Sequence, residues 1–280
     1  GDKVLIQTPV YNHFFTSIHN SGCQAAESPL VYRDNTYTID FDDLERKAAD
    51  PAVKLMLLCN PHNPAGRVWT PAELHRIGEL CLRHDVVVVA DEIHCELVMP
   101  GFRYTPFASL CEEFERRSVT CTSPSKAFNL AGLQVANIFA ADAALRARIG
   151  HSLQINETGE IGPFAIEALI AAYDEGAEWL DALNEYLHGN YRFSREYFDR
   201  NLPQYPVLPL EGTYLVWVDC RASGLTSDEL ETKLLEEAKL RINPGAIYGE
   251  AGRDFIRLNI ACPRKLLAEG LDRLRKVLKR

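Results

Sequence analysis

Three short segments of the chain carry residue types that could do chemistry together. They are Asn60-Pro61-His62-Asn63-Pro64-Ala65-Gly66, Ala90-Asp91-Glu92-Ile93-His94 and Ser123-Pro124-Ser125-Lys126. A lysine amine can bind an aldehyde as a Schiff base, and a carboxylate can keep a ring nitrogen protonated. Amide and hydroxyl groups can donate hydrogen bonds to a phenolic oxygen and a phosphate. Because one residue type for each task is present, these segments predict a pocket for pyridoxal phosphate.

Asp91 and Lys126 are the residues on which this prediction depends most. Asp91 follows Val86–Ala90, an apolar run, and a carboxylate there is costly unless a cation meets it. A pyridinium nitrogen is such a cation, although an aspartate at a strand end can also cap the next helix. Lys126 follows Asp91 by 35 residues, beside Ser123 and Ser125. Burial or nearby positive charge would make its amine nucleophilic, whereas an isolated lysine in a turn is usually solvated.

Asn63 lies in a turn whose prolines fix the backbone and whose Gly66 permits a sharp exit. Such a turn can hold the side-chain amide toward a ligand, where it can donate to the phenolic oxygen of the cofactor. A purely structural turn would also explain the prolines. It would not require the asparagine.

The elements that must position these residues follow from alternating β-branched runs and helical patterns, which are typical of a mostly parallel sheet covered by helices. Strands are predicted over 3–8, 29–33, 53–59, 86–91, 118–122 and 135–140. Thr70-Pro71-Ala72-Glu73 predicts a capped helix to about His84, and a second helix is predicted over 42–49. Ligands bind at the carboxyl ends of such strands, and the residues found there are Thr8, Asn60, Asp91 and Ser123.

The second half of the chain predicts a different arrangement. Residues 162–201 have an almost continuous helical pattern, and a long helix here would bridge two domains. Strands over 213–219 and 255–260 and helices over 228–239 and 264–279 would form a compact α+β unit. We therefore expect an α/β protein with a large domain over 1–180 and a smaller C-terminal α+β domain over 181–280.

Composition and charge argue against several classes of partner. The chain has 280 residues and a net charge of −9, so nucleic acid and anionic membranes would be repelled and a small molecule is the expected partner. The longest apolar runs are far shorter than the roughly 20 residues of a membrane helix. The first residues lack the pattern of a signal peptide. The eight cysteines form no C-x-x-C pair, so no metal site is expected. Their scattered positions indicate reduced thiols, and we therefore expect a cytoplasmic protein.

The motifs as a set resemble the fold-type I, pyridoxal phosphate-dependent aminotransferase class I/II superfamily. Within it they resemble the carbon–sulfur β-lyases of the cystathionine β-lyase (MalY/PatB) type. The resemblance covers essentially the whole chain. It rests on Thr8-Pro9-Val10-Tyr11, Asp91-Glu92-Ile93-His94, Ser123-Pro124-Ser125-Lys126-Ala127-Phe128-Asn129 and Phe255-Ile256-Arg257-Leu258-Asn259.

The resemblance implies a role for individual residues in binding the cofactor. Lys126 would carry the cofactor as a Schiff base, and Asp91 would pair with its pyridinium nitrogen. Asn63 would contact the phenolic oxygen and the substrate. Tyr11 would stack on the ring, although a tyrosine is often only a half-buried core residue.

The resemblance also implies a phosphate site and a substrate site. Ser123 and Ser125 would bind the phosphate. Arg257 would grip the substrate carboxylate with its planar guanidinium, although an arginine on an alternating strand can also be a solvated edge residue or part of an internal ion pair.

Two positions depart from the pattern of many aminotransferases. His94 occupies a cofactor-contacting position where they carry tyrosine, and Gln134 stands where they carry an arginine for the phosphate. Both departures resemble the β-lyase subgroup and favour elimination. In the family roughly a hundred residues precede the Thr8-Pro9 segment, so the N-terminal part of the large domain, with its phosphate-binding turn, looks missing here.

The implied reaction is elimination from cystathionine or another S-substituted cysteine, giving a thiol, pyruvate and ammonia. Lys126 would remove the α-proton, and either Tyr248 or the lysine itself would protonate the departing sulfur. The alternatives are an aminotransferase of class I/II and, in a minority reading, a regulatory or protein-binding role without catalysis. A homodimer is expected from the family.

Overall fold

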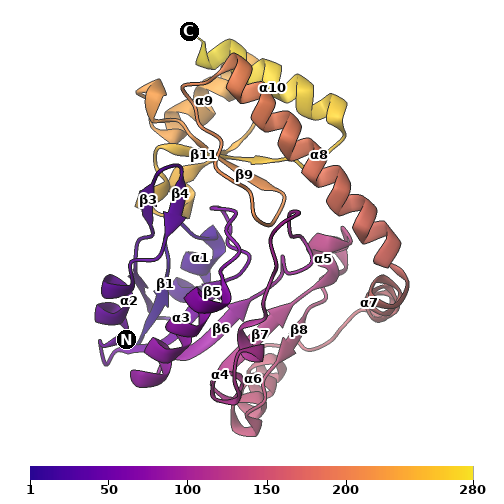
Figure 1. Ribbon diagram of the computed structural model, residues 1–280. Helices are drawn as coiled ribbons and strands as arrows, with labels where there is room; N and C mark the ends of the chain where they lie inside the picture. The colour runs from indigo at the N-terminus through magenta and orange to yellow at the C-terminus, as the bar shows by residue number, and fades with distance from the viewer. Residues whose placement is uncertain (280) are drawn as a thin grey trace.

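The computed structural model describes residues 1–279 and places a six-stranded sheet in the N-terminal half of the chain (Figure 1). The strand order is β2-β1-β5-β6-β7-β8, and all neighbouring strands are parallel except β7 and β8, which are antiparallel. The strands are β1 (Lys3–Ile6), β2 (Gln24–Glu27), β5 (Val53–Cys59), β6 (Val87–Asp91), β7 (Ser118–Thr122) and β8 (Asn137–Phe139). This confirms the predicted α/β class with a mostly parallel sheet.

Helices cover both faces of this sheet (Figure 1), and capping side chains mark where several of them begin. Thr70 and Glu73 form a reciprocal capping box at the start of one helix, with Pro71 in its first turn. Asp40 and Asp142 accept backbone hydrogen bonds at the starts of two others. The helices of this half are α1 (Asn12–Asn20), α2 (Phe41–Ala48), α3 (Pro71–Arg83), α4 (Glu112–Arg116), α5 (Pro124–Ala127) and α6 (Ala143–Ile155).

The predicted, almost continuous helical pattern over 162–201 is confirmed, and one break divides it into α7 (Pro163–Glu175) and α8 (Ala177–Asn201). The break is at Gly176. A Cβ atom there would lie 2.3 Å from the carbonyl oxygen of Ala172 and 2.5 Å from the ring of Phe128. The close approach therefore requires glycine. The long helix α8 then runs from the large sheet to the C-terminal unit, as predicted (Figure 1).

The C-terminal unit is a three-stranded antiparallel sheet packed on two helices. The strand order is β10 (Asn243–Pro244), β11 (Phe255–Asn259) and β9 (Leu215–Asp219), and the helices are α9 (Ser227–Ala238) and α10 (Arg264–Leu278). Its own apolar core includes Leu230, Ile256 and Leu271. We propose that this unit and most of α8 form the smaller domain, 181–280, and that 1–180 is the larger one.

Three details of the large domain differ from the sequence-based predictions. Strand β8 covers only part of 135–140 and runs antiparallel. Residues 29–33 contribute β3 (Val31–Arg33) to a separate hairpin with β4 (Thr36–Thr38) and not to the large sheet. Helix α6 was not predicted. None of its residues is buried, so its sequence lacks the apolar face that would reveal it.

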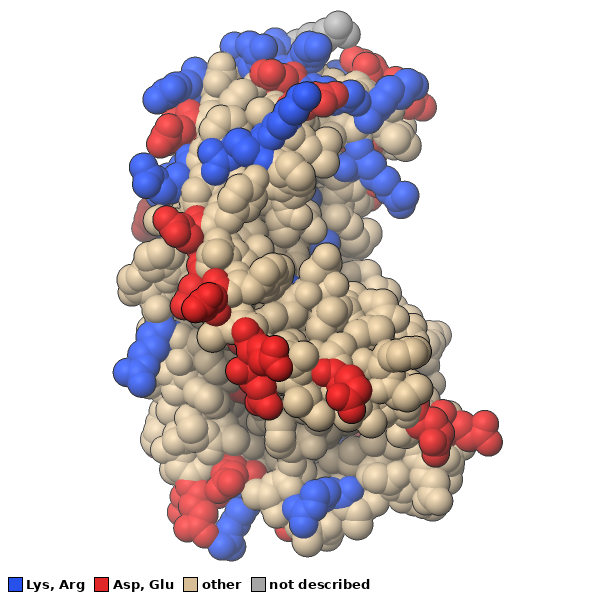
Figure 2. Space-filling model, turned by 90° about the vertical axis from the view of Figure 1, so that its right-hand side faces the viewer, with Lys and Arg blue, Asp and Glu red and all other residues tan. Residues whose placement is uncertain are grey.

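The surface that carries α7 and the start of α8 is turned toward the viewer in Figure 2. Lysine and arginine gather over the C-terminal unit, acidic residues lie across the middle, and a wide uncharged area remains (Figure 2). Exposed apolar side chains on α7 include Phe164, Ile166 and Ile170, with Phe164 81% exposed. Within residues 1–279, no helix is long and apolar enough to cross a membrane, and no cluster of three metal-ligating side chains is found.

Candidate active site

A cavity of about 360 Å³ lies between the carboxyl ends of β5 and β6 and the face of the small sheet that carries Arg257. Most of the residues predicted from the separate motifs meet in it. The lining residues are Tyr11, Asn12, His13, Cys59, Asn63, Asp91, Ile93, His94, Lys126, Tyr214, Leu215, Asn243, Ile247, Arg257 and Asn259. Residues as distant in sequence as Tyr11 and Asn259 therefore share one cavity.

Asp91 is the last residue of β6, at the floor of the cavity. One carboxylate oxygen accepts a hydrogen bond from the backbone N–H of Ile93, at 3.3 Å. Burial raises the pKa of Asp91, and the hydrogen bond from Ile93 and the charge of Lys126 oppose that rise. No side chain within residues 1–279 forms an ion pair with it. A cationic group of a ligand would supply the missing partner.

Lys126 lies on the short helix α5, just beyond the carboxyl end of β7, and lines the cavity together with Asp91. The preceding serines do not line it. The hydroxyl of Ser123 donates to the carbonyl oxygen of Val135 at 2.6 Å and is hydrogen bonded to the hydroxyl of Ser125, also at 2.6 Å. Phosphate binding by these two serines stays a prediction.

Asn63 and Asn60 lie in the same turn but have different surroundings. Asn60 is fully buried, accepts from the backbone of Trp69 and donates to the carbonyl oxygen of Thr105, so it ties the turn to its neighbours. The side-chain oxygen of Asn63 accepts from Arg257 at 3.0 Å. Its Nδ2 group is then left to donate into the cavity, as the ligand role predicted from the sequence requires.

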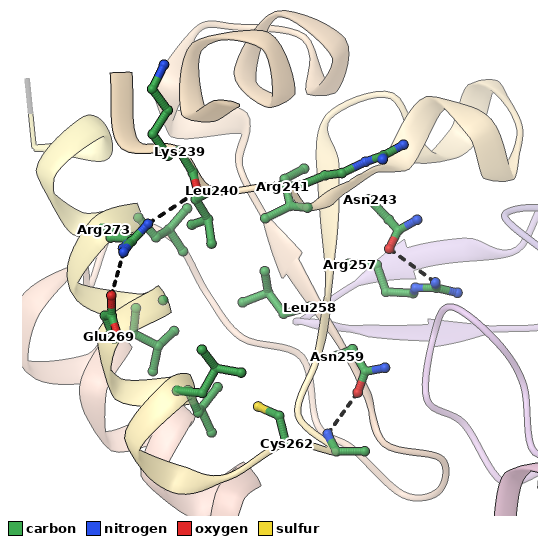
Figure 3. A pocket seen from close by; sticks show the side chains of 17 residues that line it. Lys239, Leu240, Arg241, Asn243, Arg257, Leu258, Asn259, Cys262, Glu269 and Arg273 are labelled. Atoms are coloured by element: carbon green, nitrogen blue, oxygen red, sulfur yellow. Dashed lines mark hydrogen bonds and ion pairs between the residues drawn. The ribbon is translucent and has the colours of Figure 1, made fainter. Parts of the chain in front are cut away.

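Arg257 approaches the cavity from β11. Its two terminal nitrogens donate to the side-chain oxygens of Asn63, at 3.0 Å, and Asn243, at 3.3 Å (Figure 3 shows the second bond). Its guanidinium carbon lies 4.9 Å from the ring centre of Tyr248, and its Nε has no hydrogen-bond partner. The arginine is therefore neither a solvated edge residue nor part of an internal ion pair within residues 1–279.

Tyr11 and His94 are the other two predicted residues that lie in the cavity wall. Tyr11 immediately precedes α1, and burial, aided by the charge of Asp91, raises its pKa. His94 is buried against Tyr214, with a ring-centre distance of 5.7 Å, and its Nδ1 has no hydrogen-bond partner. Burial, together with the charges of Lys126 and Arg257, lowers the pKa of His94 to about 3, so this imidazole is neutral at pH 7.

Sequence reasoning missed several residues of the wall and suggested one that lies outside it. Asn243, Tyr214 and Cys59 line the cavity, but none belongs to the motifs considered above. Tyr248, one of two candidates for protonating a departing sulfur, is fully buried and does not line the cavity. The structure therefore does not support Tyr248 in that role. No motif in the sequence pointed to Asn243.

Two buried neutral histidines should make the fold sensitive to acid. Burial lowers the pKa of His62 to about 4 and that of His94 to about 3, against 6.5 ordinarily. At these two residues the unfolded chain therefore binds more protons than the folded chain, between about pH 6.5 and pH 4. We expect the free energy of unfolding, measured by urea titration, to fall with acidification, by about 1.4 kcal/mol per pH unit for each histidine.

Substituting one histidine separates its contribution to the pH dependence of stability from the contribution of the carboxylates. His62 holds the carbonyl oxygen of Pro9 through Nε2 at 2.8 Å, and glutamine can keep that donor. His62→Gln should reduce the slope of stability against pH by about one proton. The matched control is His75→Gln, which removes an exposed histidine in place of a buried one. Equal slopes in both variants would contradict the prediction.

The cavity fits pyridoxal phosphate by the chemistry of its side chains. It presents an amine (Lys126), an unpaired carboxylate whose pKa is raised by burial (Asp91) and an amide with a free donor (Asn63). The unpartnered Nδ1 of His94 and Nε of Arg257 add polar atoms that a ligand can satisfy. An aldehyde, a pyridinium nitrogen, a phenolic oxygen and a carboxylate are the groups that this set would complement.

Comparisons with known proteins agree with this chemistry. The family model for aminotransferase class I and II matches residues 1–274. The cystathionine beta-lyase PatB of Bacillus subtilis (strain 168) is 43% identical over 278 residues, covering 99% of this chain and 72% of PatB. The MalY protein of Escherichia coli (strain K12) is 36% identical over 278 residues, covering 97% of this chain and 69% of MalY.

A solved structure extends the similarity to the fold. Cystalysin from Treponema denticola, whose crystal structure contains a pyridoxal 5'-phosphate cofactor, matches with a TM-score of 0.97 and 38% identity. The match covers 100% of this chain and 71% of cystalysin.

Proposed function

Because the chain belongs to the aminotransferase class I and II family, we propose that it is a pyridoxal phosphate-dependent carbon–sulfur β-lyase acting on S-substituted cysteines such as cystathionine. The enzyme would convert the substrate and one water molecule into a thiol, pyruvate and ammonium. With cystathionine the thiol would be homocysteine. The observation that carries the proposal is the meeting of Lys126, Asp91, Asn63 and Arg257 in one cavity, in a fold shared with relatives that are named as lyases.

Substrate recognition would begin at Arg257. Its guanidinium is held between two amide oxygens and an aromatic ring and forms no ion pair within residues 1–279. A substrate carboxylate can accept two parallel hydrogen bonds from such a group. Binding there would orient the α-carbon toward Lys126 on the opposite wall.

Lys126 would carry out the proton transfers. Its Nζ would take the proton from the α-carbon and, as an ammonium, would return a proton to the departing sulfur. The sequence suggested two candidates for protonating the sulfur, Tyr248 and the lysine. Because Tyr248 is fully buried and does not line the cavity, the lysine is the remaining candidate. One group would thus serve as base and then as acid.

The remaining residues would hold the cofactor and set its charge. When bound, pyridoxal phosphate supplies an electron sink that allows the α-carbon to lose a proton. The carboxylate of Asp91 would keep the ring nitrogen protonated, and Asn63 would donate its Nδ2–H to the phenolic oxygen. The ring of Tyr11 would cover one face of the cofactor. His94, neutral and buried, would add no charge beside it.

An assay without a keto acid tests the lyase against the aminotransferase alternative. Purified enzyme supplied with pyridoxal phosphate and cystathionine should release pyruvate and one free thiol in equal amounts, which lactate dehydrogenase and a thiol reagent can measure. Activity that appears only after a keto acid is added would show transamination and overturn the lyase assignment. S-methylcysteine should also yield pyruvate, since it carries the same cysteine portion.

We propose that the active enzyme is a cytoplasmic homodimer. The exposed apolar side chains of α7 and the uncharged area around them favour burial against a second copy (Figure 2). All eight cysteines are free thiols, which suits a reducing compartment. Light scattering should give about twice the 31.5 kDa of one chain.

A further inference from the structure

We propose that Asn243 is a positioning residue that orients Arg257 and, because its side chain is neutral, keeps the charge of that arginine available for a substrate carboxylate. This inference rests on the role of Arg257 in the proposed function. It concerns a residue that none of the motifs contains.

The register of the small sheet places the two residues together. Asn243 on β10 pairs directly with Arg257 on β11 across the antiparallel ladder. Directly opposed residues point to the same face of a sheet. The Asn243 side-chain oxygen accepts from Arg257 at 3.3 Å, a bond that Figure 3 shows from the side of a neighbouring pocket next to α10. Both side chains also line the active-site cavity. The contact is thus built into the strand pairing.

The two amide contacts hold the guanidinium from both ends. Asn63 of the large domain accepts from one terminal nitrogen and Asn243 of the small sheet from the other. The ring of Tyr248 packs against the guanidinium. An arginine side chain has many rotamers. Two hydrogen bonds and one packed face restrict Arg257 to few of them before the substrate binds, so less conformational entropy is lost when it binds a carboxylate.

The charge of these neighbours matters as much as their geometry. Burial lowers the pKa of Arg257, and the titratable groups that influence it are the hydroxyls of Tyr248, Tyr11 and Tyr214, all neutral at pH 7. Asp91 lines the same cavity without forming an ion pair with Arg257. A carboxylate at position 243 would neutralise the arginine and repel the substrate carboxylate.

The variant Asn243→Asp tests this because it changes one amide group to a carboxylate with almost no change in size. In holoenzyme, we expect KM for cystathionine to rise by on the order of 100-fold while kcat changes by less than about threefold. Asn243→Ala, which removes the contact without adding charge, should raise KM by only about 3- to 10-fold. The absorbance of the bound cofactor should be the same in both variants and in the unmodified enzyme.

A matched control adds the same charge elsewhere. Asn201→Asp alters the last residue of α8, which does not line the cavity, and should leave KM unchanged. If Asn243→Asp and Asn243→Ala raise KM equally, position 243 acts only through its contact, and the claim about charge is overturned. If neither variant changes KM by more than about twofold, the whole inference is overturned.

A binding measurement separates this inference from the proposed function. The probe is 3-(methylthio)propionate, which has the carboxylate and the thioether of a substrate but no amine and so cannot react. Calorimetry with holoenzyme should show weaker binding to Asn243→Asp than to Asn243→Ala. Failure of the unmodified enzyme to cleave any S-substituted cysteine would refute the lyase function, whereas equal binding of the probe to all variants would refute the role of Asn243.

Discussion

Replacing Lys126 with alanine is expected to reduce the release of pyruvate from cystathionine by at least about 10⁴-fold, because the proposed base, acid and attachment point of the cofactor are one amine. Lys126 lines the cavity together with Asp91 and Asn63. No other lysine is among the residues that line it. Lys126→Arg should be almost as inactive, since a guanidinium stays protonated and cannot accept the α-proton.

Two measurements distinguish loss of chemistry from loss of structure. The absorbance of the lysine-linked cofactor should vanish in Lys126→Ala. The urea unfolding midpoint of the cofactor-free protein should change little, because the side chain of Lys126 makes no hydrogen bond or ion pair with residues 1–279. Lys54→Ala, at an exposed position of β5, is the matched control and should keep full activity. A Lys126→Ala enzyme that retains more than about 1% of the activity would rule out the lysine as the base.

The residues predicted from the sequence were those that short contiguous motifs place at strand ends. Asp91 and Lys126 follow apolar strands, and parallel strands bring their carboxyl ends to one edge of the sheet. Their meeting in the cavity could therefore be inferred without a structure. Arg257 was found only through the resemblance, since its strand belongs to a second sheet whose placement no local pattern gives.

Asn243 could not be predicted, for a physical reason. Strand β10 has two residues, too few for a periodic pattern, and its importance depends on being opposite Arg257 in the ladder. The antiparallel pairing of β8 with β7 could not be predicted for the same reason, because a strand of three residues carries no signal of parallel or antiparallel pairing. Helix α6 has no buried residue and so no amphipathic stripe.

The phosphate-binding role predicted for the two serines before Lys126 stays a prediction, and the structure adds a local role for one of them. Hydroxyls beside the lysine were expected to donate to a phosphate. In the structure Ser123 occupies the cap position of α5, where it accepts from the backbone of Ser125 and donates to the carbonyl oxygen of Val135. A hydroxyl has one hydrogen to donate, so Ser123 must break this bond before it can donate to a phosphate.

Replacing Asp91 with asparagine is expected to lower kcat by about 10³-fold or more, the second large effect. An amide cannot keep the ring nitrogen of the cofactor protonated, so the ring accepts electrons from the α-carbon less well. Asp91 lies at the cavity floor with a single backbone hydrogen bond, and the change keeps its size. Asp91→Glu, which keeps the charge, should retain more activity than Asp91→Asn.

The cofactor-free protein should respond to the same substitution in the opposite direction. Burial raises the pKa of Asp91 above its ordinary value, which means that ionising this carboxyl at neutral pH costs the folded state stability. A group with a raised pKa contributes stability below its unfolded pKa and loses it as the pH rises through the folded value. Asp91→Asn should therefore raise the free energy of unfolding at pH 7.5, measured with urea, and raise it less at pH 4.

The two opposite effects together identify what the carboxylate is for. A residue that served the fold alone, as a helix cap does, would weaken the protein when replaced and would leave the chemistry of bound cofactor intact. Replacing a residue that is retained for its charge toward a cationic ligand should stabilise the ligand-free protein and impair the chemistry, because the buried charge is unfavourable until the ligand binds. Lower kcat with higher stability of the cofactor-free protein would show that Asp91 is retained for its charge toward the cofactor. Unchanged kcat with lower stability would show that it serves the fold.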